Sequence, residues 1–294
     1  MKLVQVVFIV LLSFATTIHA DYSRDQSMTV ASLNSIDIAY TTVGNKNAPA
    51  VLMVMGLTGS HRLWGEDLID GLVDAGYRVI LFDNRDTGES ARLNALGEPT
   101  LWWQLLKNTV GLEVDAPYSL NDMAADGVAV LDELGIVRAH IVGASMGGMI
   151  AQIIAAEYPN RAESLVSIMS TTGAPHLPSP ESEAQSDLQG IADTSEEGEA
   201  KMHKMGIYPK AMPRQLMAII SAGDRSEQVR SIEVPTLVLH GEDDTLLPPP
   251  HGAHTHELIA GSKYITYAGM GHNMPPQVVP ELVVAMTRHF AGNQ

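Results

Sequence analysis

The stretch VGASMGG at residues 142–148 decides the fold. An apolar strand pattern precedes it and a helical pattern follows it, so Ser145 stands at a very tight strand-to-helix turn. A turn this tight leaves no space for a side chain at Gly143 or Gly147. We therefore predict that Ser145 is a nucleophile and that the backbone N–H of Met146, at the start of the following helix, binds a developing oxyanion.

Short apolar runs alternate with helical patterns on both sides of this turn. Such runs are typical of parallel strands that are buried on both faces, and their alternation with helices indicates a doubly wound α/β sheet. The first two runs alternate polar and apolar residues and predict a hairpin at the sheet edge. The prediction is a mostly parallel eight-stranded sheet. Strands are expected at 28–33, 36–43, 50–55, 77–82, 140–142, 165–169, 236–240 and 264–267, and helices at 64–75, 120–134, 146–158, 254–260 and 278–290.

A serine hydroxyl needs a base near neutral pH, and the base needs an acid that orients it. His272 lies in a glycine-containing loop after the last predicted strand and is the expected base. Asp244 follows the strand before it and is the expected acid, although spacing alone does not exclude its neighbour Asp243. The loop at 170–175 is the rival position for the acid, and it contains no carboxylate.

The loop that follows the strand at 50–55 is expected to provide a second backbone donor to the oxyanion. Leu57 is the candidate, because it follows the first glycine of this loop. The turn-rich segment after the next strand contains Asp83 and Arg85. We expect these two side chains to brace the loops by hydrogen bonding and to take no part in the chemistry.

These residues together resemble the α/β-hydrolase fold superfamily over about residues 27–291. Several of its segments also resemble the aclacinomycin methylesterase-like branch of carboxylesterases. The resemblance implies ester hydrolysis through Ser145, Asp244 and His272, without a cofactor. Many such enzymes carry histidine where this chain has Met55, but a backbone donor at Leu57 does not depend on that side chain. The branch similarity rests on residues 83–88, 116–123, 143–150, 170–173, 221–225 and 269–275.

Residues 171–231 contain no clear strand and predict a small helical cap, inserted into a hydrolase core of residues 21–170 and 232–294. Such insertions usually lie over the carboxyl ends of the strands, where ligands bind. In a second excursion, at 91–118, the pair Trp102 and Trp103 favours a small buried helix beside the pocket over an interfacial helix. The cap methionines either line an adaptable apolar pocket or pack the cap onto the core. They are Met202, Met205, Met212 and Met217.

The first twenty residues have the layout of a secretory signal peptide. Lys2 gives a positive start, an almost wholly apolar run extends over 3–12, and Ala20 is a small residue before the expected cleavage site. A transmembrane anchor needs about 18 or more consecutive apolar residues, and this run is too short. We expect an exported protein, periplasmic or secreted, with no stable membrane anchor.

Composition excludes several classes of partner. The 294 residues include 18 Lys and Arg against 34 Asp and Glu, and this net charge of −16 argues against nucleic acids and anionic membranes. The absence of cysteine excludes disulfides, thiolate zinc sites and a cysteine nucleophile. We expect no metal site, because three prolines just precede the only histidine-rich segment and the serine mechanism needs no metal. That segment contains His251, His254, His256 and Glu257.

The leading hypothesis is an exported serine hydrolase that cleaves small-molecule esters of small or medium acyl chain through an acyl-enzyme. Serine at position 145 argues against the dehalogenases and epoxide hydrolases of this fold, which use a carboxylate nucleophile. A proline-iminopeptidase-like peptidase and a cofactor-free perhydrolase are the alternative enzymes. A ligand-binding protein on a hydrolase scaffold is the alternative from another class. The sequence carries no signal for an oligomeric state.

Overall fold

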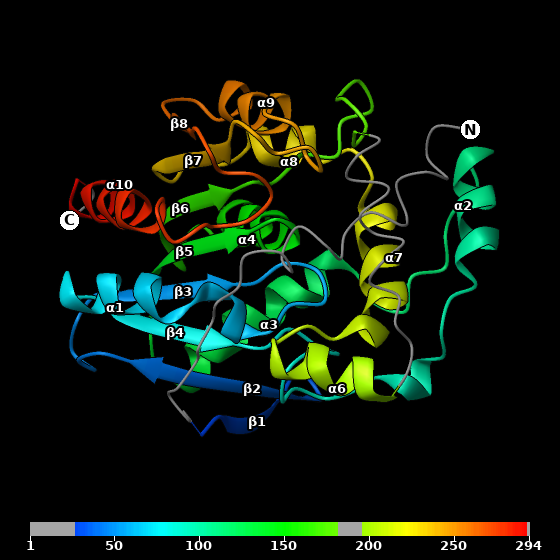
Figure 1. Ribbon diagram of the computed structural model, residues 1–294, viewed down its shortest axis with the longest axis horizontal. Coiled ribbons are helices and arrows are strands. Elements are labelled where there is room, and N and C mark those ends of the chain that lie inside the picture. The colour runs from blue at the N-terminus through cyan, green and yellow to red at the C-terminus, as the bar shows by residue number, and fades with distance from the viewer. Residues whose placement is uncertain (1–26, 182–195, 293–294) are drawn as a thin grey trace.

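The computed structural model describes residues 27–181 and 196–292, and its eight strands form one sheet (Figure 1). The strand order is β1-β2-β4-β3-β5-β6-β7-β8. The first three strands in this order pair antiparallel and the others pair parallel, which confirms the predicted sheet and its edge hairpin. The strands are β1 (Thr29–Leu33), β2 (Ile36–Val43), β3 (Ala50–Val54), β4 (Arg78–Phe82), β5 (Ala139–Ala144), β6 (Ala162–Ile168), β7 (Thr236–Gly241) and β8 (Lys263–Tyr267).

Helices cover both faces of the sheet. On β3, Met53 packs with side chains of α1 and α10. Its neighbour in the strand, Leu52, packs with side chains of α3 and α4. Successive strand residues point to opposite faces, so an unbroken apolar strand serves two cores. The α-helices are α1 (Glu66–Asp74), α2 (Leu101–Thr109), α3 (Leu120–Glu133), α4 (Met146–Glu157), α6 (Glu196–Lys204), α7 (Met212–Ala222), α8 (Ser226–Arg230), α9 (Pro250–Leu258) and α10 (Val279–Ala291), and the 3₁₀ helices are η2 (His61–Trp64), η3 (Asn94–Leu96) and η4 (Pro209–Ala211).

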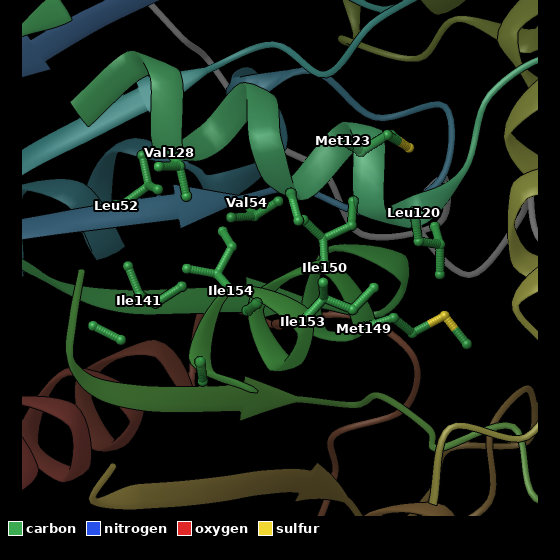
Figure 2. Packing of buried hydrophobic residues seen from close by; sticks show 14 of the residues in the cluster. Leu52, Val54, Leu120, Met123, Val128, Ile141, Met149, Ile150, Ile153 and Ile154 are labelled. Carbon is green, nitrogen blue, oxygen red and sulfur yellow. The ribbon is translucent and has the colours of Figure 1, made fainter. Parts of the chain in front are cut away.

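Helix α4 is buried on all sides from Met146 to Ala155. A helix that is apolar all round is stable only when other elements surround it. Ile150 and Ile154 lie in one cluster with Ile141 of β5 and with side chains of β3 and α3 (Figure 2). This packing fixes the start of α4, and therefore the residue before it, relative to the sheet.

Between β6 and β7 the described chain forms α6, η4, α7 and α8. Figure 1 shows α6 and α7, together with α2, beyond the ends to which the arrows of β3, β5 and β6 point. Met217 is fully buried against α2, and the other three cap methionines are partly buried against the core. The structure therefore favours the interpretation that these methionines pack the cap onto the core. The domain limits 21–170, 171–231 and 232–294 stay a prediction.

The expectation of a buried helix at Trp102 and Trp103 was wrong. The segment does form α2, but the two side chains are 68% and 48% exposed. Leu105 is the residue that α2 buries, against Leu216 and Met217 of α7. This nine-residue helix carries apolar side chains on more than one face, so one face can be buried while other apolar residues are exposed to solvent.

Helix α9 begins at Pro250, four residues before the predicted start. Proline is favourable in the first turn of a helix, because the N–H that it lacks has no partner there. Pro250 is therefore the first residue of the helix, Pro249 is its N-cap, and the three prolines do not delay its start.

The predicted signal peptide, residues 1–20, lies outside the described residues. Within residues 27–181 and 196–292, no helix has both the length and the apolar character that crossing a bilayer requires.

Burial of His140 on β5 predicts acid sensitivity of the fold. Its Nδ1 atom is 2.8 Å from Ser164 Oγ, and its ring stacks on Phe290 with centroids 4.3 Å apart. Burial lowers the pKa of His140 from 6.5 to about 4. The folded state therefore binds this proton less tightly than the unfolded chain does. The stability that His140 contributes is complete above pH 6.5 and is lost as the pH falls towards 4.

We expect the free energy of unfolding to fall by up to about 3 kcal/mol over this window through His140, measured by urea denaturation. In His140→Gln, which keeps a polar atom for Ser164 and does not titrate, the fall should be smaller. If the variant shows the same pH dependence as the wild type, the loss belongs to other groups.

Candidate active site

Ser145 lies at a strained turn between β5 and α4. Its φ of 57° and ψ of −121° are rare for a residue with a side chain. A Cβ atom at Gly143 would lie 2.1 Å from the Gly147 carbonyl oxygen, and one at Gly147 would lie 2.0 Å from that of Val54. Both positions therefore require glycine, as the sequence predicts. The strain is held by the surrounding core, and in this conformation Ser145 Oγ lies within hydrogen-bond distance of His272.

The structure brings Ser145, His272 and Asp244 together at the carboxyl ends of the strands. His272 Nε2 lies 2.9 Å from Ser145 Oγ, and His272 Nδ1 lies 2.8 Å from Asp244 Oδ2. The three residues are 6%, 3% and 2% exposed, respectively. A buried imidazole that contacts a hydroxyl on one side and a carboxylate on the other has the arrangement needed for general-base activation of the hydroxyl.

The surroundings of Asp244 favour its ionised form. Burial raises the pKa of this carboxyl, but the charge of His272 and the hydrogen bonds from His240 and His272 outweigh it. The pKa of Asp244 therefore lies below its ordinary value, and the carboxylate can stabilise an imidazolium at neutral pH. Its second oxygen, Oδ1, accepts hydrogen bonds from the backbone N–H groups of Leu246, at 3.0 Å, and Leu247, at 2.9 Å.

Asp243, the competing acid, has a different environment. Its side chain is exposed, and its Oδ2 atom accepts a hydrogen bond of 2.8 Å from the backbone N–H of Gly269. Geometry thus separates two carboxylates that spacing alone did not, and it places the expected acid, Asp244, beside His272.

His240, on β7, is a neighbour of this site that the sequence analysis does not single out. The ring is fully buried, with Nε2 2.7 Å from the carbonyl oxygen of Leu247 and 3.5 Å from Asp244 Oδ2. It thus supports the loop that carries the acid. The available signal was its position at the end of the strand, four residues before Asp244.

Leu57 and Met146, the predicted oxyanion donors, lie on two sides of the serine. A Cβ atom at Gly56 would be 3.2 Å from Ser145 Cβ, so the loop that carries Leu57 passes directly over the nucleophile. Met146 is the first residue of α4, where backbone N–H groups have no partner within the helix. Among the described residues, neither N–H donates a hydrogen bond. Both are therefore available to a ligand, and their role stays a prediction.

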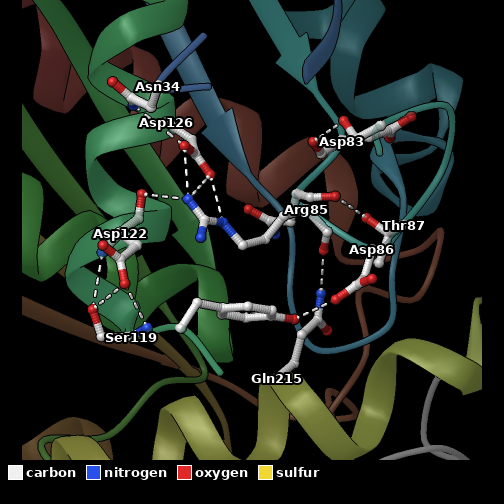
Figure 3. A network of polar contacts seen from close by, with 12 residues as sticks. Asn34, Asp83, Arg85, Asp86, Thr87, Ser119, Asp122, Asp126 and Gln215 are labelled. Carbon is white, nitrogen blue, oxygen red and sulfur yellow. Dashed lines mark hydrogen bonds and ion pairs between the residues drawn. The ribbon is translucent and has the colours of Figure 1, made fainter. Parts of the chain in front are cut away.

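Asp83 and Arg85 brace the surrounding loops, as predicted from the sequence. Asp83 Oδ1 accepts hydrogen bonds from the backbone N–H and the ring of His61, both at 2.8 Å. Burial raises the pKa of Asp83, but these and other hydrogen bonds lower it below its ordinary value. Arg85 forms a two-pronged ion pair with Asp126 of α3, at 2.8 and 2.9 Å (Figure 3).

A second buried ion pair connects the cap to the same loops. Arg214 of α7 is 1% exposed and binds both oxygens of Asp86, at 2.8 and 2.9 Å. Tyr118 donates its hydroxyl to Asp86 at 2.8 Å, and burial together with the charge of Asp86 raises the pKa of this tyrosine. Removing one partner of such a pair strands a buried charge, at a cost of about 3–5 kcal/mol. No local pattern in the sequence predicts this pair, because its members are 128 positions apart.

The histidine-rich segment in α9 is engaged in ordinary hydrogen bonds. His251 contacts Thr171 Oγ1 at 2.7 Å and the carbonyl oxygen of Pro178 at 3.0 Å, and His254 contacts Thr172 Oγ1 at 2.9 Å. These contacts connect α9 to the segment that follows β6. In the part of the chain that the structure describes, no three histidine or carboxylate side chains gather in a way that could hold a metal ion.

A doubly wound sheet with a strained serine after β5, next to a histidine and a buried carboxylate, defines a hydrolase of the α/β class. The chain belongs to the family described as the alpha/beta hydrolase fold, whose model matches residues 49–201. That range includes Ser145, Leu57 and Met146, whereas Asp244 and His272 follow it.

Relatives and solved structures of similar fold include several hydrolases. Rhodomycin D methylesterase of Streptomyces peucetius is 26% identical, over 84% of this chain and 92% of its own. A bifunctional esterase/perhydrolase of Acinetobacter calcoaceticus is 27% identical, over 84% of this chain and 93% of its own. The crystal structure of an enol-lactonase from Burkholderia xenovorans has a TM-score of 0.68 at 21% identity and covers 90% of this chain and all of its own. This last likeness concerns the fold.

Proposed function

We propose that the protein is a carboxylic ester hydrolase in which Ser145, His272 and Asp244 form the catalytic triad. The observation that carries the proposal is the continuous hydrogen-bonded chain from Ser145 Oγ through the His272 ring to Asp244, with distances of 2.9 and 2.8 Å. The similarity to a methylesterase and to an esterase/perhydrolase supports ester substrates.

In the proposed reaction, His272 Nε2 takes the hydroxyl proton as Ser145 Oγ attacks the ester carbonyl carbon. The carbonyl oxygen becomes an oxyanion that accepts hydrogen bonds from the N–H groups of Leu57 and Met146. The C–O bond to the alcohol then breaks, and His272 returns the proton to the departing alkoxide. A water molecule, deprotonated by His272, cleaves the acyl-enzyme in the same way and releases the carboxylic acid.

Perhydrolysis is the second candidate, because one relative carries that activity in its name. Hydrogen peroxide would replace water in the second half of the reaction, and the product would be a peracid. Adding peroxide to the ester assay and measuring peracid by iodide oxidation tests this candidate without changing the assignment of the residues.

We expect esters with short acyl chains to be the better substrates. Ser145 is 6% exposed and His272 is 3% exposed, so the nucleophile lies beneath surrounding structure that favours small groups. In a panel of p-nitrophenyl esters, acyl chains of roughly two to eight carbons should give the highest kcat/KM. Long-chain emulsified triglycerides should be poor substrates, with no jump in rate above the solubility limit. Trp102 and Trp103 are exposed and do not supply the pocket wall expected of them, so the prediction rests on this burial alone.

The same panel tests the alternatives. Aminoacyl amides serve as peptidase substrates, and a preference for them would replace the esterase proposal. Rapid labelling of Ser145 by a fluorophosphonate is expected, because only an activated serine reacts quickly. A ligand-binding protein on this scaffold would bind an ester without labelling or turnover. A rate jump at an interface, or a preference for about sixteen carbons, would contradict the prediction for short chains.

We also propose that the protein is exported, from the charge and apolar pattern of residues 1–20. N-terminal sequencing of the protein recovered from the periplasm or medium of a secreting host should begin at or near Asp21. An intact Met1 in a soluble cytoplasmic product of the native organism would contradict export.

A further inference from the structure

The cap binds the loop that carries Leu57 through its backbone. The N–H of Tyr208 donates to the carbonyl oxygen of Thr58 at 2.8 Å, and the N–H of Ser60 donates to that of Gly206 at 2.8 Å. Between these bonds, Gly59 and Ile207 form an isolated antiparallel bridge. The loop after β3, which passes over the nucleophile, is therefore paired along one side with the segment between α6 and η4.

A single cap side chain completes this attachment. Gln215 of α7 is fully buried, and its Oε1 atom accepts a hydrogen bond of 2.7 Å from the backbone N–H of Thr58. Its Nε2 atom donates a hydrogen bond of 3.0 Å to the carbonyl oxygen of Arg85 (Figure 3). One amide thus connects the loop after β3 to the loop after β4, and it uses both its acceptor and a donor to do so.

The backbone at this contact has a strained conformation that its surroundings must hold. Thr58 has a φ of 60°, in the left-handed region that a β-branched residue rarely enters. The hydrogen bond that Thr58 N–H donates to Gln215 fixes the peptide unit between Leu57 and Thr58. This peptide unit is the next one along the chain after the peptide that contains the Leu57 N–H, the predicted oxyanion donor. Without this acceptor the N–H of Thr58 would be buried and unpaired, and the loop would have to turn to satisfy it.

Helix α7 is itself held in place next to Gln215. The adjacent residue, Arg214, binds Asp86 with two hydrogen bonds of 2.8 and 2.9 Å. Two successive residues of α7 are therefore hydrogen-bonded to these loops. Gln215 binds both the loop that carries Leu57 and the loop after β4, and Arg214 binds the loop after β4. The helix cannot shift without pulling on the backbone over the nucleophile.

We propose that Gln215 is a positioning residue, which sets the direction of the Leu57 N–H and makes the oxyanion site depend on the seating of the cap. Its complete burial means that it does not touch substrate and acts only through the loop. This inference rests on the proposed function, because it assigns a role in stabilising the oxyanion. An oxyanion donor acts in the transition state, so a displaced donor lowers kcat and leaves substrate binding nearly unchanged.

The test is Gln215→Met, which preserves the length of the side chain and removes both hydrogen bonds. We expect kcat for p-nitrophenyl acetate to fall about 10- to 100-fold. The fall should not exceed the loss caused by deleting one oxyanion donor, because the Leu57 N–H is displaced but not removed. KM should stay within about twofold of the wild type. The affinity for phenylboronic acid, whose tetrahedral serine adduct places an oxygen in the oxyanion site, should fall by a factor similar to that of kcat.

The matched control is Gln104→Met on α2. Gln104 is also a buried glutamine that accepts a backbone N–H, that of Asp115 at 2.9 Å, and donates to the Asp115 side chain. The hydrogen bonds of its side chain go to Asp115 and not to the loop that carries Leu57, so we expect a lower melting temperature with kcat and boronate affinity unchanged.

If the wild type is active and folded Gln215→Met shows unchanged kcat and boronate affinity, this inference is wrong. The esterase proposal would not be affected by that result. Equal losses of kcat in both glutamine variants would also overturn it, because they would indicate a general effect of cap stability. If Gln215→Met does not fold, Gln215→Asn decides by the same criteria, since the shortened amide cannot reach both loops. A wild-type protein without ester turnover would refute the proposed function, and this inference with it.

Discussion

Replacing Ser145 with alanine should reduce ester turnover by at least about 10³-fold, because the hydroxyl that contacts His272 Nε2 is removed. The remaining rate would come from water and from binding of the ester beside the oxyanion donors. The measurement is the kcat of purified Ser145→Ala protein, prepared from a host without its own esterase. Labelling by a fluorophosphonate should disappear together with turnover.

The fold should survive this substitution. The backbone strain at Ser145 is carried by the glycines around it and by the core beneath α4, and alanine preserves both. The loss of one hydroxyl hydrogen bond changes the free energy of unfolding by about 1 kcal/mol. Ser167→Ala is the control, because this serine is also buried, on the neighbouring strand β6, where it accepts a hydrogen bond from Gln152. Activity near that of the wild type is expected for Ser167→Ala, and full activity in Ser145→Ala would refute the mechanism.

The parts of this molecule that could be predicted from sequence are those with a local cause. At positions 143 and 147 an added Cβ atom would lie within 2.1 Å of a backbone oxygen, and this requirement for glycine is visible in the residue type. The strands are visible because both faces of a parallel sheet are apolar. The order of Ser145, Asp244 and His272 is informative because each follows a strand, and parallel strands end at the same edge of a sheet.

The parts that escaped prediction depend on contacts between distant segments. Gln215 and Thr58 are 157 positions apart, and no pattern distinguishes this glutamine from a solvated one on a helix. The exposure of Trp102 was missed for a related reason. The composition of α2 makes several of its faces apolar, and only the position of α7 decides which face is buried. Asp244 was the expected acid, but spacing alone did not exclude Asp243, because the direction in which the loop turns decides between them.

Asp244→Asn should lower kcat by about 10⁴-fold, whereas Asp243→Asn should leave it within a few-fold of the wild type. The reason lies in the second oxygen of Asp244, which accepts two backbone N–H groups, from Leu246 and Leu247. In the asparagine variant the carbonyl oxygen must keep that position, since an NH₂ group there would face two donors. The NH₂ group is then directed at His272 Nδ1, where the carboxylate oxygen now lies at 2.8 Å.

An NH₂ group in that position donates to Nδ1, so the neutral imidazole carries its proton on Nε2. This is the tautomer that cannot accept the proton of Ser145, and the base is lost while every heavy atom keeps its place. In Asp243→Asn the side chain is exposed, and its carbonyl oxygen still accepts the N–H of Gly269, so neither geometry nor tautomer at His272 changes. Both variants should melt close to the wild type. Measured kcat values in the reverse order would make Asp243 the acid, and equal small losses would mean that His272 needs no carboxylate to hold its tautomer.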